Sequence, residues 1–230
     1  VNRPADAEAA AFADACERRP EFVLTEPLKS LFLDSVDYDP KLAARRMVTY
    51  WDMKYFLFGR DRAFDNATLD SSVMEECQQD IANGLVVQLP GVDSFGRGLV
   101  LVNVSKLPSP LDEATQNRCL KLLWYVLHLT LREERVRKNG LVLIHNMDGF
   151  KSEHMKVHML SKMAIMLEYC LPLKLVAMHD CCEQKVRWLL SVALPLFKWL
   201  MNKRLRLRYL VHYGSAEDIY SALKVYGITK

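Results

Sequence analysis

The sequence predicts an α/β protein in which a helical N-terminal region is followed by a mixed, largely parallel sheet with crossover helices. Apolar residues in the first quarter of the chain recur at helical spacing. Residues 141–147 form a continuous apolar segment, which is typical of a parallel strand buried on both faces. Beyond that segment, helix-like and strand-like stretches alternate, as they do where helices connect parallel strands.

Length and composition indicate an ordered globular protein. The chain has 230 residues, of which 50% are hydrophobic and 26% are charged, so it can bury a substantial core and is not disordered. The net charge of +3 is too small to indicate nucleic-acid binding by itself. Because Ser191, Pro195 and Lys198 interrupt the longest apolar stretch, we expect no membrane span and only peripheral membrane contact.

The cysteines and the first residues favour a cytoplasmic location. The six cysteines are scattered and form no C-x-x-C pair, so we expect reduced thiols, with disulfides as the alternative. The polar start, Val1-Asn2-Arg3-Pro4, contains no secretory signal. Its Val in place of Met is compatible with a fragment of a longer chain.

The N-terminal region is predicted to be helical. Asp39 can cap a helix that has Pro40 at its first position, and Gly59 can end that helix. A polar connector follows, and it marks the expected domain boundary. We therefore expect an N-terminal helical region at residues 1–70 and a second domain at residues 71–230.

The second domain is predicted to contain five strands, the first two joined as a hairpin by a glycine-rich turn. The expected strands are residues 85–89, 99–104, 141–147, 173–179 and 205–213. The expected helices are residues 72–83, 109–139, 152–169, 183–199 and a final helix capped by Ser215. Acidic residues near the start of the longest helix and basic residues near its end favour the helix dipole.

Several short motifs occur in a characteristic order. They are Leu31-Phe32-Leu33 followed by Tyr38-Asp39, then Asp93-x-x-Gly96-Arg97 before a Val/Leu strand, then the block 140–149 ending in Asp148-Gly149, and finally His212 before Gly214. In order and spacing these motifs resemble the CRAL-TRIO (Sec14-like) lipid-binding family across nearly the whole chain. Residues 24–58 are similar to the N-terminal helical region of that family.

This resemblance implies a sheet that forms the floor of a hydrophobic lipid pocket and a movable amphipathic helix that gates it. The gate falls near residues 182–201, whose apolar and basic side chains suit both hydrocarbon and a membrane surface. An ordinary buried helix is the alternative. The pocket candidates are Trp124, Leu127, His128, Ile144, Met163, Met178, Val186, Leu189, Leu190, Val192 and Phe197. The headgroup or membrane-surface candidates are Lys185, Arg187, Lys198, Lys203, Arg204, Arg206 and Arg208.

The chain departs from the phosphatidylinositol-binding members of that family. Those members carry basic residues where this chain reads Asp34-Ser35-Val36-Asp37, and a glutamate after an aromatic-Pro pair where this chain reads Tyr169-Cys170-Leu171-Pro172. Aspartates in place of cations remove charge-assisted hydrogen bonds to a phosphate, and a buried phosphoinositol would then be poorly compensated. The resemblance therefore favours a hydrophobic pocket without identifying the headgroup.

Two groups of residues are candidates for reactive sites. His154 and His158 have the spacing to face one metal ion on a helix, but the glutamate of an H-E-x-x-H motif is absent, so surface or core histidines are favoured. The sequence His-Asp-Cys at residues 179–181 lies on an expected strand, where neighbouring side chains point to opposite faces. We therefore expect neither a metal site nor an enzyme.

Two further patterns have open alternatives. Five cations and no acid lie among residues 198–208, which is compatible with attraction to an anionic lipid surface or with a solvated face. Six methionines cluster between Met147 and Met178, where they can adapt to an irregular ligand or simply fill a core. Nucleic acid is not expected, because no aromatic platform accompanies the cations.

These observations predict a protein that binds a phospholipid or another small lipophile and transfers or presents it at membrane surfaces through a gated pocket. A bound lipid and a transient anionic membrane are the expected partners, an additional protein partner is left open, and no cofactor is expected. The alternative is a non-catalytic protein- or membrane-interaction module whose pocket is filled by side chains.

Overall fold

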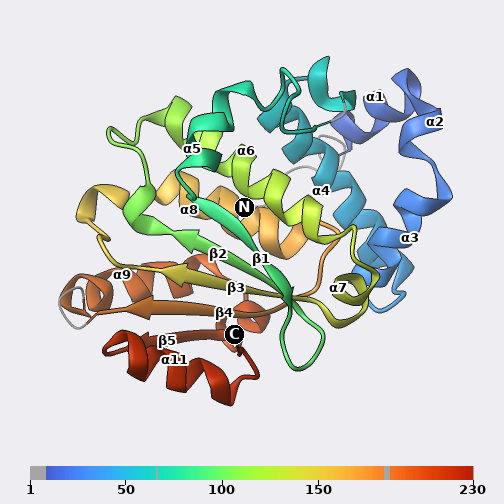
Figure 1. Ribbon diagram of the computed structural model, residues 1–230. Coiled ribbons are helices and arrows are strands. Elements are labelled where there is room, and N and C mark those ends of the chain that lie inside the picture. Colours follow the sequence, from blue (N-terminus) through green and yellow to red (C-terminus); the bar gives the residue numbers. More distant parts are fainter. Residues whose placement is uncertain (1–8, 66, 184–186, 230) are drawn as a thin grey trace.

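A five-stranded sheet with the order β1-β2-β3-β4-β5 forms the centre of the protein (Figure 1). The structure is a computed structural model that describes residues 9–65, 67–183 and 187–229. Strands β1 and β2 are antiparallel, whereas β2, β3, β4 and β5 run parallel, which confirms the expected mixed sheet. The strands are β1 Val86–Val92, β2 Gly98–Asn103, β3 Leu141–Asn146, β4 Leu175–Cys182 and β5 Tyr209–Tyr213.

Helices cover both faces of this sheet. On one face, α6, α8 and α9 bury apolar side chains against the strands, and on the other, Ile228 after α11 packs against Val142 and Ile144. These helices are α6 Glu113–Thr130, α8 Val157–Ile165, α9 Arg187–Leu200 and α11 Ala216–Val225. Shorter helices are α5 Gln78–Ala82, α7 Glu134–Asn139 and α10 Lys203–Arg206, and a π-helical turn, Met166–Cys170, follows α8.

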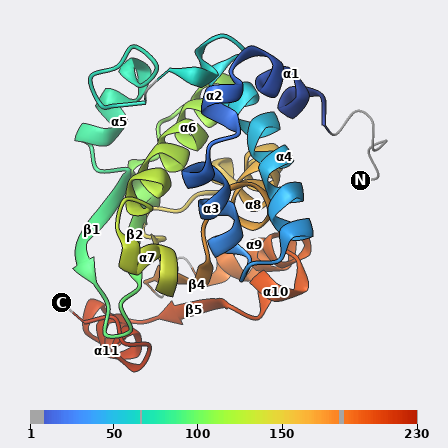
Figure 2. The same ribbon diagram turned by 90° about the vertical axis from the view of Figure 1, so that its right-hand side faces the viewer.

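The N-terminal helices form a further layer outside α6 and α8 (Figure 2). They are α1 Ala10–Arg18, α2 Pro20–Val23, α3 Glu26–Ser35 and α4 Pro40–Phe58. Asp39 caps α4 by accepting hydrogen bonds from two backbone N–H groups, as the sequence predicts. Trp51 is fully buried among aromatic rings, and the Tyr50 ring lies 4.9 Å from that of Trp124 on α6. Aromatic packing thus joins α4 to α6.

One arginine connects the N-terminal layer to the π-helical turn. The Arg46 guanidinium on α4 donates to the carbonyl oxygens of Glu168 at 2.7 Å and Leu173 at 3.0 Å, and to the Ser35 hydroxyl at 3.1 Å. Each of these acceptors is neutral, and burial lowers the pKa of Arg46. The cation is therefore held by backbone dipoles rather than by an acid.

The predicted long helix over residues 109–139 is wrong as a single element. Asp112, rather than Ser109, caps α6, and the chain turns after Thr130 before α7 begins. The Arg137 guanidinium folds back and donates to the Leu131 carbonyl at 2.9 Å, which gives a carbonyl group at the C-terminal end of α6 a hydrogen-bond partner. The turn brings Val136 to Gly98, where an added Cβ would lie 2.9 Å from a Val136 methyl.

The start of the strand expected over residues 205–213 is wrong, because its first residues belong to a helix. Residues 203–206 form α10 rather than the start of a strand, because the Asn202 side chain accepts a hydrogen bond from the Leu205 N–H and caps a helix there. Strand β5 begins only at Tyr209. The segment 152–169 likewise divides into a 3₁₀ turn, α8 and the π-helical turn, and Ser72 does not cap a helix because α5 starts at Gln78.

We predict that Arg46→Met lowers the free energy of unfolding by about 2 kcal/mol, because it leaves two carbonyls and a hydroxyl without their charged donor. Urea denaturation measures this change in stability, and the slope of the free energy of unfolding against urea concentration should stay unchanged. The matched control is Arg45→Met, since Arg45 is exposed on the same helix and should change stability by less than about 0.5 kcal/mol. Equal effects of the two substitutions would contradict the role of Arg46.

We also predict that His128→Phe weakens the loss of stability in acid. Burial lowers the pKa of His128 from 6.5 to about 4, so below about pH 6.5 the unfolded chain takes up a proton that the folded protein refuses. As the pH falls between these two pKa values, each such histidine lowers the free energy of unfolding by at most about 1.4 kcal/mol per pH unit. Burial also lowers the pKa of His179 to about 4, so the pH dependence of stability should become weaker in the His128→Phe variant but should not vanish.

Chemical denaturation between pH 4 and pH 7 tests this prediction for His128. His158→Phe is the control, because His158 is exposed and its removal should leave the pH dependence unchanged. A His128→Phe variant with the full dependence of the natural protein would disprove the assignment.

Candidate functional site

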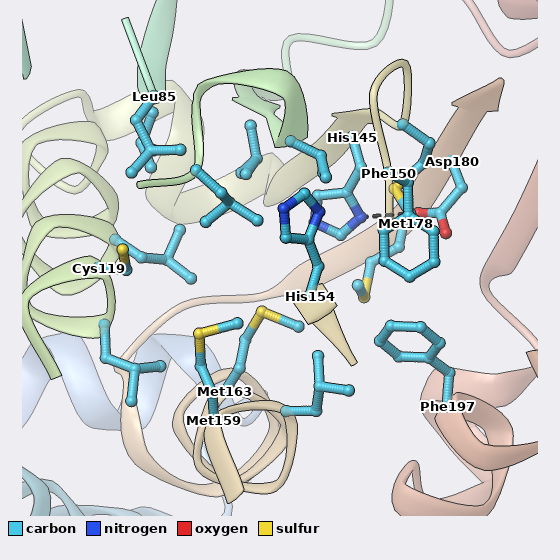
Figure 3. Close-up of a pocket in the computed structure, with 18 of the residues that line it drawn as sticks. Leu85, Cys119, His145, Phe150, His154, Met159, Met163, Met178, Asp180 and Phe197 are labelled. Carbon is cyan, nitrogen blue, oxygen red and sulfur yellow. Dashed lines mark hydrogen bonds and ion pairs between the residues drawn. The ribbon is translucent and has the colours of Figure 1, made fainter. Parts of the chain in front are cut away.

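An apolar cavity lies between the sheet and the helices α6, α8 and α9 (Figure 3). Its volume is about 100 Å³. Strands β1 to β5 contribute one wall, and Phe197 from α9 closes the side opposite α6. The lining residues are Leu85, Val86, Val102, Val104, Leu107, Cys119, Leu120, Leu123, His145, Met147, Phe150, His154, Met159, Leu160, Met163, Met178, Asp180, Phe197, Met201 and Tyr209.

Methionines form much of this lining. Five of the lining side chains are thioethers: Met147, Met159, Met163, Met178 and Met201. A methionine side chain has three rotatable bonds and a polarisable sulfur, so it can repack around an irregular apolar shape at low cost. The wall of the cavity is therefore more adaptable than a wall of branched aliphatic side chains.

The polar part of the cavity is a cluster built across three neighbouring strands. His145 on β3 and Asp180 on β4 are register partners, and the His145 Nδ1 lies 2.7 Å from an Asp180 carboxylate oxygen. The Tyr209 hydroxyl on β5 donates to the other carboxylate oxygen. Burial, followed by the Asp180 charge, raises the pKa of Tyr209, which therefore stays a phenol. Both oxygens of the buried carboxylate thus have a donor.

A second imidazole, that of His154, reaches the cavity from the turn after β3. Its Nδ1 accepts a hydrogen bond from the Lys151 backbone N–H at 3.2 Å, and its ring packs edge-on against Phe150. Burial lowers the pKa of His154, so the neutral ring is favoured at pH 7. Because Nδ1 is an acceptor, the proton of the neutral ring sits on Nε2.

The cluster has the geometry of a base and its orienting acid, but the described lining supplies no activated nucleophile. Cys119 is the thiol that lines the cavity, and burial raises its pKa to about 12. A thiol with that pKa is protonated and inert near neutral pH. Within the described residues, no group of three metal-ligating side chains converges. The arrangement is therefore suited to hydrogen bonding inside an apolar site.

The structure brings only part of the predicted pocket set to the cavity. Met163, Met178 and Phe197 line it. Leu190 is fully buried in the adjacent cluster formed by α9 with Met147 and Phe150, and Leu189 packs at its edge. Val192 is 63% exposed on the outer side of α9, and Val186 lies outside the described residues.

The other predicted pocket residues face elsewhere. Trp124 and His128 stack on each other and contact Tyr50, so they point to the N-terminal layer, and Leu127 is fully buried on the same helix. Ile144 belongs to the apolar cluster on the opposite face of the sheet. His145 and Met147 line the cavity instead, and Leu143 lies in the main core, because alternate residues of a strand share a face.

The predicted headgroup residues gather around α9 and α10, although Lys185 lies outside the described residues. Arg187, Lys198, Lys203, Arg204 and Arg206 are exposed. Arg187 lies 5.3 Å from the centre of the Tyr213 ring. Arg208 is half-buried and donates to the Leu175 carbonyl at 2.7 Å, so it supports the β4–β5 connection.

Sequence reasoning missed the polar cluster of His145, Asp180 and Tyr209. The available signal was a histidine within the otherwise apolar segment 141–147 and an aspartate within β4, because polar residues in buried strands need partners. Their partnership could not be read from the sequence, since it depends on the register of three strands. None of the described helices is long and apolar enough to cross a membrane.

Comparisons with known proteins agree with this architecture. The family model described as the CRAL/TRIO domain matches residues 82–224. The solved structure titled "Crystal structure of Sfh5" superposes with a TM-score of 0.52 at 10% identity, covering 92% of this chain and 82% of that one. No curated protein sequence matches this chain. Because the family model spans well over half of the residues, the chain belongs to the CRAL/TRIO domain family.

Proposed function

We propose that this protein carries or presents a hydrophobic molecule that it holds in the cavity beneath α9. The observation that carries the proposal is the adaptable, largely apolar lining, in which five methionines surround one small polar cluster. Ligand sites in proteins combine this kind of apolar wall with a few convergent polar groups. Membership of a family of lipid-binding domains supports the same conclusion.

The size of the cavity implies that loading requires movement. At about 100 Å³ the cavity is smaller than the roughly 300–1,000 Å³ that binding sites for small molecules usually offer. Helix α9 is the element suited to move, because only Leu190 and Ala193 are fully buried along it. Displacing Phe197 with α9 would enlarge the cavity toward the surface.

The outer side of α9 supports a membrane as the trigger for that movement. Trp188, Val192 and Trp199 are 70%, 63% and 75% exposed, and their spacing places them on one side of the helix. Exposed cations on α10 follow immediately, together with Leu207, which is 76% exposed. Aromatic and apolar residues bordered by cations are typical of a helix that lies in a membrane interface.

The cavity favours a ligand without a phosphate inside it. No lysine or arginine is among the lining residues that the structure describes, so a buried phosphate would lack a charged donor. The Asp180 carboxylate in the lining would repel it further. We therefore infer a neutral lipophile, or a lipid whose headgroup stays at the surface.

The small volume also favours a second candidate function. If the cavity does not open, the protein is an interaction module whose side chains fill its core, and the exposed side of α9 contacts a membrane or a protein. Native mass spectrometry of the purified protein, followed by organic extraction, separates the two. A stoichiometric apolar ligand supports the carrier, whereas a bare protein that takes up no lipid from vesicles supports the module.

We predict that Met159→Trp abolishes ligand retention. Met159 lines the cavity, and an indole ring in its place would occupy most of the available volume. The matched control is Ile165→Trp, because Ile165 lies on the same helix but is 42% exposed and does not line the cavity. Native mass spectrometry should show bound ligand in the control alone. Equal retention in both variants would place the ligand elsewhere.

We further predict that Trp188→Ala and Trp199→Ala each weaken binding to anionic vesicles by about ten-fold or more. Burying a large apolar side chain contributes about 1.5–3 kcal/mol, and each indole is exposed in the free protein. Vesicle co-sedimentation measures the loss. The control is Phe95→Ala in the β1–β2 turn, where the ring is 61% exposed and lies far from α9 in sequence. A loss in the control of equal size would contradict the assignment of α9.

A further inference from the structure

One lysine of the N-terminal layer lies among aromatic rings instead of beside an acid. The Lys54 ammonium on α4 lies 4.9 Å from the centre of the Trp51 ring and 5.6 Å from that of Tyr50, both on the same helix. Phe22 on α2 adds a third ring, whose centre is 5.1 Å from the ammonium. Burial is the cause that acts on this ammonium, and no carboxylate of the described residues pairs with it.

The sequence of α4 explains why Lys54 has no acidic neighbour on its own helix. Side chains three and four positions apart are the ones that can meet on a helix. Around Lys54 these positions hold only aromatic and aliphatic residues, namely Tyr50, Trp51, Leu57 and Phe58. Lys29 and Lys138 differ, because each forms an ion pair with a glutamate one turn earlier, at 2.9 Å and 2.6 Å.

The three rings replace only part of the water that a charged ammonium loses. An aromatic face attracts a cation but offers no lone pair to its N–H groups. The Lys54 side chain is half-buried, and burial lowers its pKa from 10.5 to about 8. At pH 7 about one Lys54 amine in ten is then neutral, against fewer than about one in a thousand for a lysine with the ordinary pKa. A desolvated, neutral amine has the free lone pair that a nucleophile needs.

The ionisable group that α6 places against the Tyr50 ring is also a base. The centre of the His128 ring lies 5.7 Å from that of Tyr50. Burial first, and the Lys54 charge after it, lower the pKa of His128 to about 4. Two bases therefore share one aromatic environment, and a positive charge on either of them disfavours a positive charge on the other.

We propose that Lys54 is a nucleophilic lysine that small acyl thioesters acylate directly. The neutral amine attacks the thioester carbonyl carbon, a C–N bond forms, the C–S bond breaks, and the released thiolate takes up the amine proton. The product is a neutral amide, so acylation removes a charge that the rings solvate poorly. Lys54 is only half-buried and Phe22 is 40% exposed, so one side of the group of rings faces solvent. This modification site is independent of the carrier function.

Acetylation by a small thioester tests the proposal. S-acetyl-N-acetylcysteamine is added to the whole protein, and peptide mass spectrometry follows the initial acetylation rate of each lysine. At pH 7 Lys54 should react roughly ten-fold faster than Lys138, although the Lys138 side chain is 71% exposed, because more of the Lys54 amine is neutral. The Lys54 rate should level off above about pH 8. The Lys138 rate should still rise at that pH, because its hydrogen bond to Glu134 raises the pKa of Lys138.

A matched pair of variants places an acid beside the amine. Phe22→Glu puts a carboxylate where the third ring lies, so it should favour the ammonium and slow Lys54 acetylation at pH 7 by roughly ten-fold relative to Phe22→Gln. Phe22→Gln removes the same ring without adding a charge. If the variants do not fold, the pH profile of the natural protein decides alone. Lys54 that reacts no faster than Lys138, a Lys54 rate that rises with pH as that of Lys138 does, or equal rates in two folded variants would each overturn the proposal.

Discussion

The buried carboxylate of Asp180 is the constraint on which the site depends. It sits on β4 and binds His145 from β3 and Tyr209 from β5, so one charge ties three parallel strands at the cavity wall. A buried charge without donors would be strongly destabilising, so the cluster stabilises only the register that supplies both of them. The same contacts orient the His145 ring, which makes the polar end of the cavity a consequence of strand pairing.

Helix α9 has two sides with different physical roles. Its inner side buries Leu190 and Ala193 and places Phe197 over the cavity, whereas its outer side exposes two tryptophans to solvent. The end of the helix is held by polar contacts, because the Asn202 N–H donates to the Glu168 carboxylate at 3.0 Å. Glu168 belongs to the π-helical turn that Arg46 binds, so the N-terminal layer supports the region at the end of α9.

Much of the fold could be predicted because it depends on local patterns. The apolar segment 141–147, the Asp39 cap and the Ser215 cap each act through their own neighbours, and the structure contains the elements they predict. The pocket set was predicted less well, since α6 is buried between the sheet and α4 and is apolar around most of its circumference. Its pattern therefore does not distinguish Leu120 and Leu123, which line the cavity, from Trp124 and His128, which face α4.

If an apolar ligand enters the cavity beneath α9, it changes the surroundings of the methionine methyl groups there, which report on its entry directly. The chain has ten methionines, of which Met147, Met159, Met163, Met178 and Met201 line the cavity. Met47, Met53 and Met74 are buried outside that lining and provide internal references. In a methyl-labelled protein titrated with 1-dodecanol and with its own extracted lipid, the five lining signals should shift in the NMR spectrum while the three references stay in place. Lining signals that stay unmoved by every ligand, or an equal shift of all ten, would contradict the claim.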